Sequence, residues 1–92
     1  MIKYNTHTLR KLNSLFQDLL YEVRYEKGNF NSGYCIVESQ NIIIINKFYD
    51  TEGKINALLD ILSNISVDTD LLSAPSVKFY KVIKKTAFSD EQ

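Results

Sequence analysis

The stretch GYCIVESQNIIIINKFYDTEG, residues 33–53, decides the fold expected of this chain. Residues 34–38 and 42–45 are rich in the apolar, aromatic and β-branched side chains that favour strands. Only residues 39–41 separate the two runs, and a connection this short predicts a β-hairpin. The second run is four isoleucines without alternation. This predicts that both of its faces are covered, either at the centre of a sheet or at the seam of a dimer.

Amphipathic helices are predicted on both sides of this hairpin. Over residues 6–20, apolar side chains recur at spacings of three and four, which is typical of a helix with one buried stripe. Downstream, Asp50 and Thr51 offer N-cap side chains, and Glu52 suits the first turn of a helix. A second helix with its own apolar stripe is therefore expected to follow Thr51.

The remaining segments complete one domain. Residues 21–26 alternate between apolar and charged side chains, which predicts a first strand with one wet face, and residues 27–33 are dense in turn formers. A short helical turn is expected at residues 68–72. Pro75 follows Ser73 at a position that suits the first turn of a helix, so a last helix is predicted over residues 74–84.

This order predicts an α+β fold: a helix, a three-stranded antiparallel β-meander, then two to three helices packed on one face. At 92 residues the chain has the length of one domain. We expect residues 1–85 to form that domain and the polar residues 86–92 to be a flexible tail.

Composition and charge exclude several classes of protein. Eleven basic and eleven acidic residues give a formal charge of zero, so no global field attracts nucleic acid or membrane. No apolar run approaches the roughly 20 residues of a membrane span, and the N-terminus lacks the features of a signal peptide. With Cys35 as the only cysteine, no internal disulfide can form, which suits a reducing compartment. A cytoplasmic protein is expected.

Catalytic chemistry has little support in the residues. A nucleophilic Cys35 needs a nearby base, and nothing places the only histidine, His7, beside it; a small buried strand residue is the simpler interpretation. One Cys and one His cannot form a zinc site. The acids Asp68 and Asp70 suit helix starts better than a hard-ion site, and the glycines match no phosphate-binding loop. We therefore predict no enzyme activity, metal or cofactor.

Two groups of side chains are candidates for binding. The first is a set of aromatic residues in and around the sheet, too many for so small a core to bury: Tyr21, Tyr25, Phe30, Tyr34, Phe48 and Tyr49. The second is a basic patch on the last helix: Lys78, Lys81, Lys84 and Lys85. Aromatic surfaces are typical of protein interfaces, whereas clustered lysines suit phosphates.

The block YEVRYEKGNFNSGYCIVESQNIIIINKFYDTEGKINALLDIL, residues 21–62, resembles a small, functionally uncharacterised bacterial protein family. Its helix, its hairpin ending in Ile-Asn and a basic residue, and its acid-capped helix follow in the family's order. The layout is also similar to the core of the zinc metallopeptidases of the phage-repressor-cleaving type, in which an Ile-Asn strand end precedes a helix bearing HExxH. Aligning that pair on Ile45 and Asn46 puts the metal motif near residues 60–64, where its histidines and glutamate are missing. The resemblance thus implies a scaffold without metal or hydrolysis.

These observations lead to one function and an alternative. We expect a non-enzymatic intracellular protein-interaction domain that self-associates as a homodimer, or binds another protein, through its aromatic sheet surface. The alternative is a nucleic-acid or nucleotide binder that uses the lysine-rich last helix. An enzyme that uses Cys35 ranks third.

Overall fold

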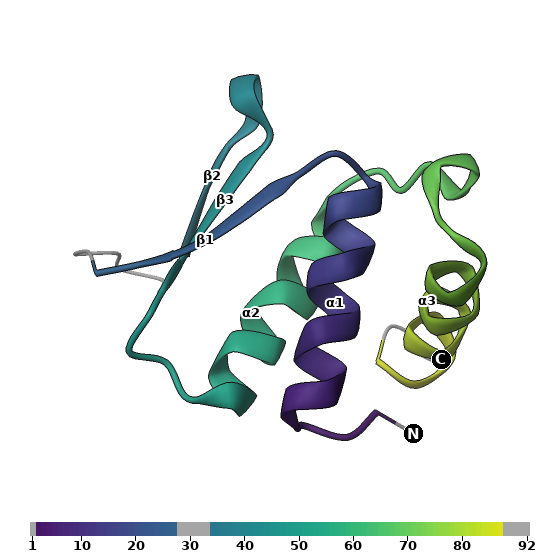
Figure 1. The fold of residues 1–92 in the computed structure, drawn as a ribbon, viewed down its shortest axis with the longest axis horizontal. Coiled ribbons are helices and arrows are strands. Elements are labelled where there is room, and N and C mark those ends of the chain that lie inside the picture. The colour runs from purple at the N-terminus through teal and green to yellow at the C-terminus, as the bar shows by residue number, and fades with distance from the viewer. Residues whose placement is uncertain (1, 28–33, 88–92) are drawn as a thin grey trace.

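The computed structural model describes residues 2–27 and 34–87, and these form three helices beside a three-stranded sheet (Figure 1). The elements, in chain order, are α1 (Thr6–Asp18), β1 (Glu22–Glu26), β2 (Tyr34–Val37), the 3₁₀ turn η1 (Glu38–Gln40), β3 (Ile42–Asn46), α2 (Thr51–Asn64), the 3₁₀ turn η2 (Thr69–Leu71) and α3 (Ala74–Thr86). The α+β class is confirmed. Most of the predicted tail and of the predicted loop lies outside the described residues.

The sheet has the order β1-β3-β2 and is mixed, so the predicted antiparallel meander is wrong. β2 and β3 form the expected antiparallel pair, but β1 pairs with β3 in parallel. A meander would have put the isoleucine strand at an edge. Its apolar side chains are better covered in the centre, whereas β1, with charged residues at alternate positions, suits an edge. The structure thus shows the central position, which is one of the two positions predicted for this strand.

The helices form two layers on one side of the sheet. α1 and α2 lie against the sheet, and α3 packs on the side of α1 that faces away from it (Figure 1). The last helix therefore covers a helix and not the sheet. The core residues that lose all exposure come from all of these layers: Leu12, Leu15, Phe16, Ile43, Ile45, Ile55, Leu58, Ile61 and Ile83.

α2 begins as its sequence predicts. The Asp50 side chain accepts a hydrogen bond from the Gly53 N–H at 2.8 Å, which is an N-cap contact. Six of its residues are buried, and two of these, Ile61 and Leu62, fall where the metallopeptidase layout would put its metal motif. The side chains of Ile61 and Leu62 therefore pack in the hydrophobic core.

The chain leaves α1 through a left-handed residue, Leu20, with φ 68°. The Leu20 N–H donates to the Gln17 carbonyl at 2.9 Å, and the Tyr21 N–H donates to the Phe16 carbonyl at 2.9 Å. This pair of bonds is a Schellman motif, and the Phe16 and Tyr21 rings, 6.1 Å apart, supply its apolar contact. The motif usually places glycine where this chain has leucine.

Replacing Leu20 with glycine should therefore stabilise the protein. The leucine side chain is 69% exposed, so its removal costs little burial. A left-handed backbone costs a residue with a Cβ roughly 1–2 kcal/mol, and the greater freedom of glycine in the unfolded chain offsets part of the gain. We expect a net increase of about 0.5–1 kcal/mol in the free energy of unfolding, measured in urea. Leu20→Ala keeps the Cβ and should not show this increase.

A contact between segments far apart in sequence fixes the start of α3. The Asp18 carboxylate at the end of α1 accepts a hydrogen bond from the Ser73 N–H at 3.0 Å. This backbone bond, with help from the hydroxyl of Ser76, lowers the pKa of Asp18 below its usual value of 3.8.

The Asp18 contact predicts a pH-dependent contribution to stability. A carboxyl whose folded-state pKa is lowered stabilises the fold above its unfolded pKa, and this contribution is lost as pH falls through the folded value. Asp18→Asn removes the charge and keeps the shape. We expect wild type to be the more stable protein at neutral pH, with the difference shrinking below about pH 4. Urea titrations at several pH values would measure this difference, and a difference independent of pH would contradict a hydrogen bond that depends on the ionised carboxylate.

Candidate functional site

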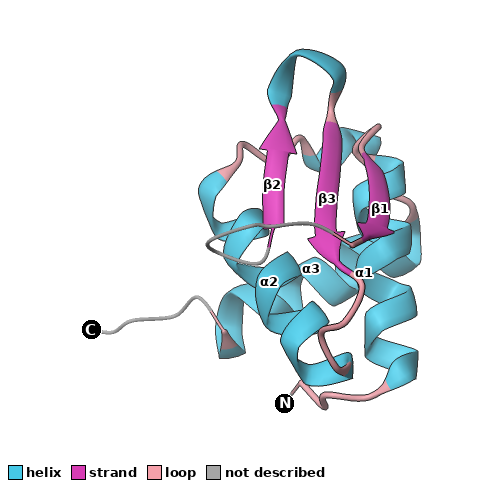
Figure 2. Cartoon of the chain, turned by 90° about the vertical axis from the view of Figure 1, so that its left-hand side faces the viewer, coloured by secondary structure: helices cyan, strands magenta, loops and turns pink. Residues whose placement is uncertain are grey.

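The face of the sheet that points away from the helices carries an apolar cluster. Cys35 pairs with Ile44, and Val37 pairs with Ile42, so these four side chains share that face. The alternate isoleucines, Ile43 and Ile45, are fully buried beneath the helices. In the described part of the chain no helix lies on the outer side (Figure 2). We call Cys35, Val37, Ile42 and Ile44 the outer sheet face.

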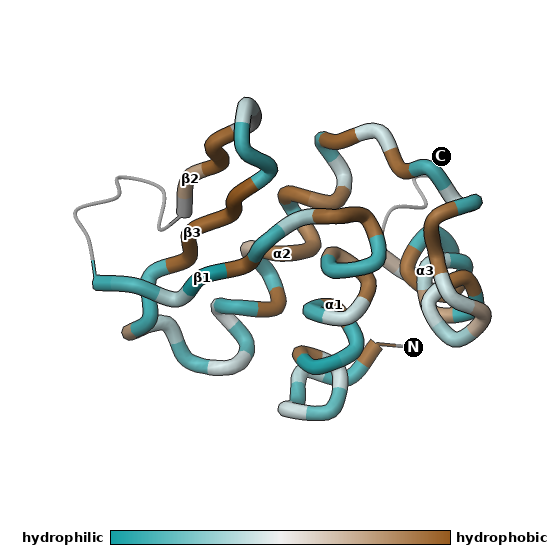
Figure 3. Tube along the Cα trace, turned by 45° about the horizontal axis from the view of Figure 1, so that its top comes forward, coloured by the Kyte–Doolittle hydropathy of each residue, from teal (hydrophilic) through white to brown (hydrophobic). Residues whose placement is uncertain are grey.

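The outer sheet face is apolar along two adjacent strands and charged along the third. Hydrophobic residues dominate β2 and β3 in Figure 3, whereas β1 is mostly hydrophilic. On β1, Glu22, Arg24 and Glu26 are exposed beside Ile42, Ile44 and Asn46. Arg24 Nε donates to Glu22 Oε2 at 2.7 Å, and this bond raises the pKa of the guanidinium. The face thus has an apolar centre and a rim with charges of both signs.

The candidate aromatic residues do not form one surface. Tyr21 and Tyr25 pack against the core, with Tyr21 edge-on to Phe16. The Tyr25 hydroxyl donates to Asn13 Oδ1 at 2.8 Å, and burial raises the pKa of this phenol despite that bond. Strand parity separates these tyrosines from the outer sheet face, since Tyr25 pairs with the buried Ile45.

The other aromatic candidates are scattered. Phe48, just beyond β3, is 69% exposed, and the Lys47 ammonium lies 5.4 Å from its ring centre. Tyr49 is partly buried against the core. Phe30 and the side chain of Tyr34 lie outside the described part. Of the candidate aromatic rings that the structure describes, Phe48 is therefore the one that is strongly exposed.

The basic patch is present on α3 and is larger than the sequence predicted. Its four predicted members are all exposed, and α3 contains no acidic residue: Lys78, Lys81, Lys84 and Lys85. The neighbouring start of the chain adds Lys3, Arg10 and Lys11. Sequence reasoning missed these because their closeness to α3 comes from helix packing. A neutral chain therefore has a strongly basic side.

Cys35 and His7 lie in different parts of the fold. Cys35 is on the outer sheet face, whereas His7 is exposed in the first turn of α1, beside α3. The two side chains are therefore too far apart in the fold to act together as a nucleophile and its base. Within residues 2–27 and 34–87, no group of three or more His, Cys, Asp or Glu residues could hold a metal ion.

Comparisons with known proteins add no further assignment. No protein-family model, no curated protein and no solved structure matches this chain. None of the helices in the described residues has the length and apolar character needed to cross a bilayer. The function must therefore be inferred from the residues of the fold.

Proposed function

We propose that this chain is a non-enzymatic protein-interaction domain that self-associates through its outer sheet face. The observation that carries the proposal is the apolar cluster of Cys35, Val37, Ile42 and Ile44, on the side of the sheet where the described residues form no helix. Apolar surface that a partner covers stabilises a complex by roughly 25 cal/mol per Å² before the costs of association are subtracted.

A second copy of the chain is the occupant that best fits this surface. A two-fold interface brings the same patch of both copies together, so each apolar cluster would cover the other. The rim supports this arrangement because it carries both signs of charge. Arg24 and Glu26 lie two residues apart on the edge strand, and a two-fold axis can bring Arg24 of one copy close to Glu26 of the other.

The charge of the rim argues against a strongly acidic or basic partner at the same face. A partner with one dominant sign would meet a like charge from either Arg24 or its flanking glutamates. Cys35 on the same face suits a reducing, cytoplasmic compartment, where an accessible thiol stays free.

Sedimentation equilibrium tests the proposal directly. We expect the average mass of the wild-type protein to rise toward that of a dimer between about 1 µM and about 1 mM, a range that covers weak to moderate affinities. Val37→Lys should keep the protein monomeric, because it places a charge in the apolar cluster. A wild-type protein that stays monomeric throughout this range would overturn the proposal.

A further inference from the structure

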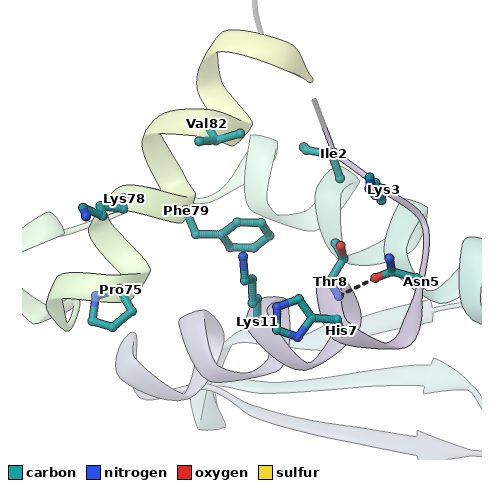
Figure 4. A pocket seen from close by; sticks show the side chains of 10 residues that line it. All are labelled: Ile2, Lys3, Asn5, His7, Thr8, Lys11, Pro75, Lys78, Phe79 and Val82. Carbon is teal, nitrogen blue, oxygen red and sulfur yellow. Dashed lines mark hydrogen bonds between the residues drawn. The ribbon is translucent and has the colours of Figure 1, made fainter.

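A second candidate site lies between the start of α1 and α3, on the opposite side of the helices from the sheet (Figures 1 and 4). Six residues between positions 2 and 11 and four between positions 75 and 82 line an open cavity of about 540 Å³ there. This volume is within the roughly 300–1,000 Å³ range of small-molecule sites.

Among the described residues that line the cavity, the ionisable side chains are all basic. They are Lys3, His7, Lys11 and Lys78, and none of these described lining residues is a carboxylate. The nearest acid in α1, Asp18, is at the other end of that helix and is bonded to Ser73. Like charges gathered without a counter-charge favour an anionic ligand.

A buried hydroxyl adds a specific donor. Thr8 is only 7% exposed, and its backbone N–H donates to Asn5 Oδ1 at 2.9 Å. Within the described residues the Thr8 hydroxyl itself has no hydrogen-bond partner. Figure 4 shows its oxygen pointing into the cavity, toward the space below Ile2 and Phe79. A buried hydroxyl without a partner costs free energy, and a ligand oxygen would remove that cost.

The position of this hydroxyl reinforces the preference for an anion. Thr8 lies in the first turn of α1, where the helix dipole concentrates partial positive charge. Lys11 lies one turn further along, and Figure 4 shows its ammonium reaching toward Phe79 across the cavity. An anion held at Thr8 is thus within reach of both the helix dipole and a flexible ammonium.

The other walls of the cavity are apolar. Ile2 and Val82 close one end, Pro75 lies at the other, and Phe79 stands between them (Figure 4). The Lys11 Nζ atom lies 5.2 Å from the centre of the Phe79 ring. When the Lys11 ammonium moves from this ring to the anionic group of the ligand, a flat ring in the ligand can take its place against Phe79.

We infer that this cavity binds a small phosphate monoester that carries an aromatic ring, in the class of nucleoside monophosphates. Its phosphate accepts from Thr8 Oγ1 and interacts with Lys3 and Lys11, and its ring packs on Phe79. The site shares no residue with the outer sheet face and does not depend on self-association.

Titrations of ¹⁵N-labelled protein at low salt test the inference, with AMP, inorganic phosphate and adenosine as probes. We expect AMP to bind more tightly than either of its two parts, with shifts centred on Thr8, Lys11 and Phe79. Lys11→Gln should weaken AMP about tenfold or more, since it removes a charge-assisted bond. Thr8→Val, which keeps the shape and loses the hydroxyl, should weaken AMP several-fold, and Thr8→Ser should restore it.

The matched control is Lys47→Gln, which removes one positive charge near the sheet and should leave AMP binding unchanged. Equal weakening by Lys47→Gln and Lys11→Gln would overturn the inference, as would the absence of AMP binding to folded wild type. A single-stranded oligonucleotide is the last probe in these titrations. If it binds with a steep salt dependence, responds to Lys81→Gln and Lys85→Gln, and ignores Thr8→Val, the basic side is a polyanion surface and not a monophosphate site.

Discussion

Replacing Ile45 with alanine is expected to lower the free energy of unfolding by about 2–5 kcal/mol. Ile45 has no exposed surface, lies in the central strand and belongs to the cluster that joins the sheet to α1 and α2. Its truncation removes buried methyl groups and leaves a cavity between layers. A domain of this size is stable by only about 5–14 kcal/mol, so the loss is a large share of the total. Urea denaturation would show a lower midpoint with an unchanged slope.

The adjacent residue of the same strand provides the control. Ile44 has the same side chain and neighbouring backbone, but points to the outer sheet face and is only partly buried. Ile44→Ala measured on the monomer should cost less than half as much as Ile45→Ala. Equal losses would mean that both faces of β3 are covered within one chain, and would contradict the proposed interface.

The second large effect is expected from Ile44→Glu, which should abolish self-association while the protein stays folded. Burying the new carboxylate against an apolar partner costs several kcal/mol, so the dissociation constant should rise by about 100-fold or more. Arg24 is the register neighbour of Ile44 within the same sheet, and it can offset the charge in the monomer. Sedimentation equilibrium measures the association, and circular dichroism verifies the fold.

A charge placed elsewhere separates this effect from a general change in solubility. Leu71 in η2 is 46% exposed, and Leu71→Glu makes the same change in charge and a similar change in hydropathy away from the sheet. We expect it to leave the association unchanged. If Leu71→Glu and Ile44→Glu weaken the association equally, the outer sheet face is not the interface.

The sequence predicts the elements of this fold well and their pairing less well. The spacing of apolar residues locates α1 and α2, and Pro75 after Ser73 locates the start of α3. The Asp50 cap follows from the residues alone, and the central position of β3 is one of the two positions that they allow. The parallel pairing of β1 with β3 does not, because alternation shows which side of a strand is wet but not which strand lies beside it. The prediction of a meander assumed that strands adjacent in sequence are adjacent in space.

The candidate sites could likewise be predicted from the sequence only in part. Lysines on the solvent side of α3 are visible in the sequence, since they repeat at helical spacing. Their neighbours Lys3 and Lys11, and the unpartnered hydroxyl of Thr8, depend on how α1 packs against α3. For the tyrosines, the alternation of side chains along β1 already puts Tyr25 on the opposite face from the exposed Arg24 and Glu26. A count of aromatic residues does not take this alternation into account.

The most direct test of self-association through the outer sheet face uses Cys35 as a reporter within that face. Thiol labelling by a small reagent is measured on folded wild-type protein over a wide range of protein concentration, with Ile44→Glu as the dissociated reference. The account predicts that the labelling rate of wild type falls as concentration rises, because the partner covers Cys35, and that the rate of Ile44→Glu stays constant. A wild-type rate that does not change while the protein forms dimers would place the interface elsewhere and contradict the account.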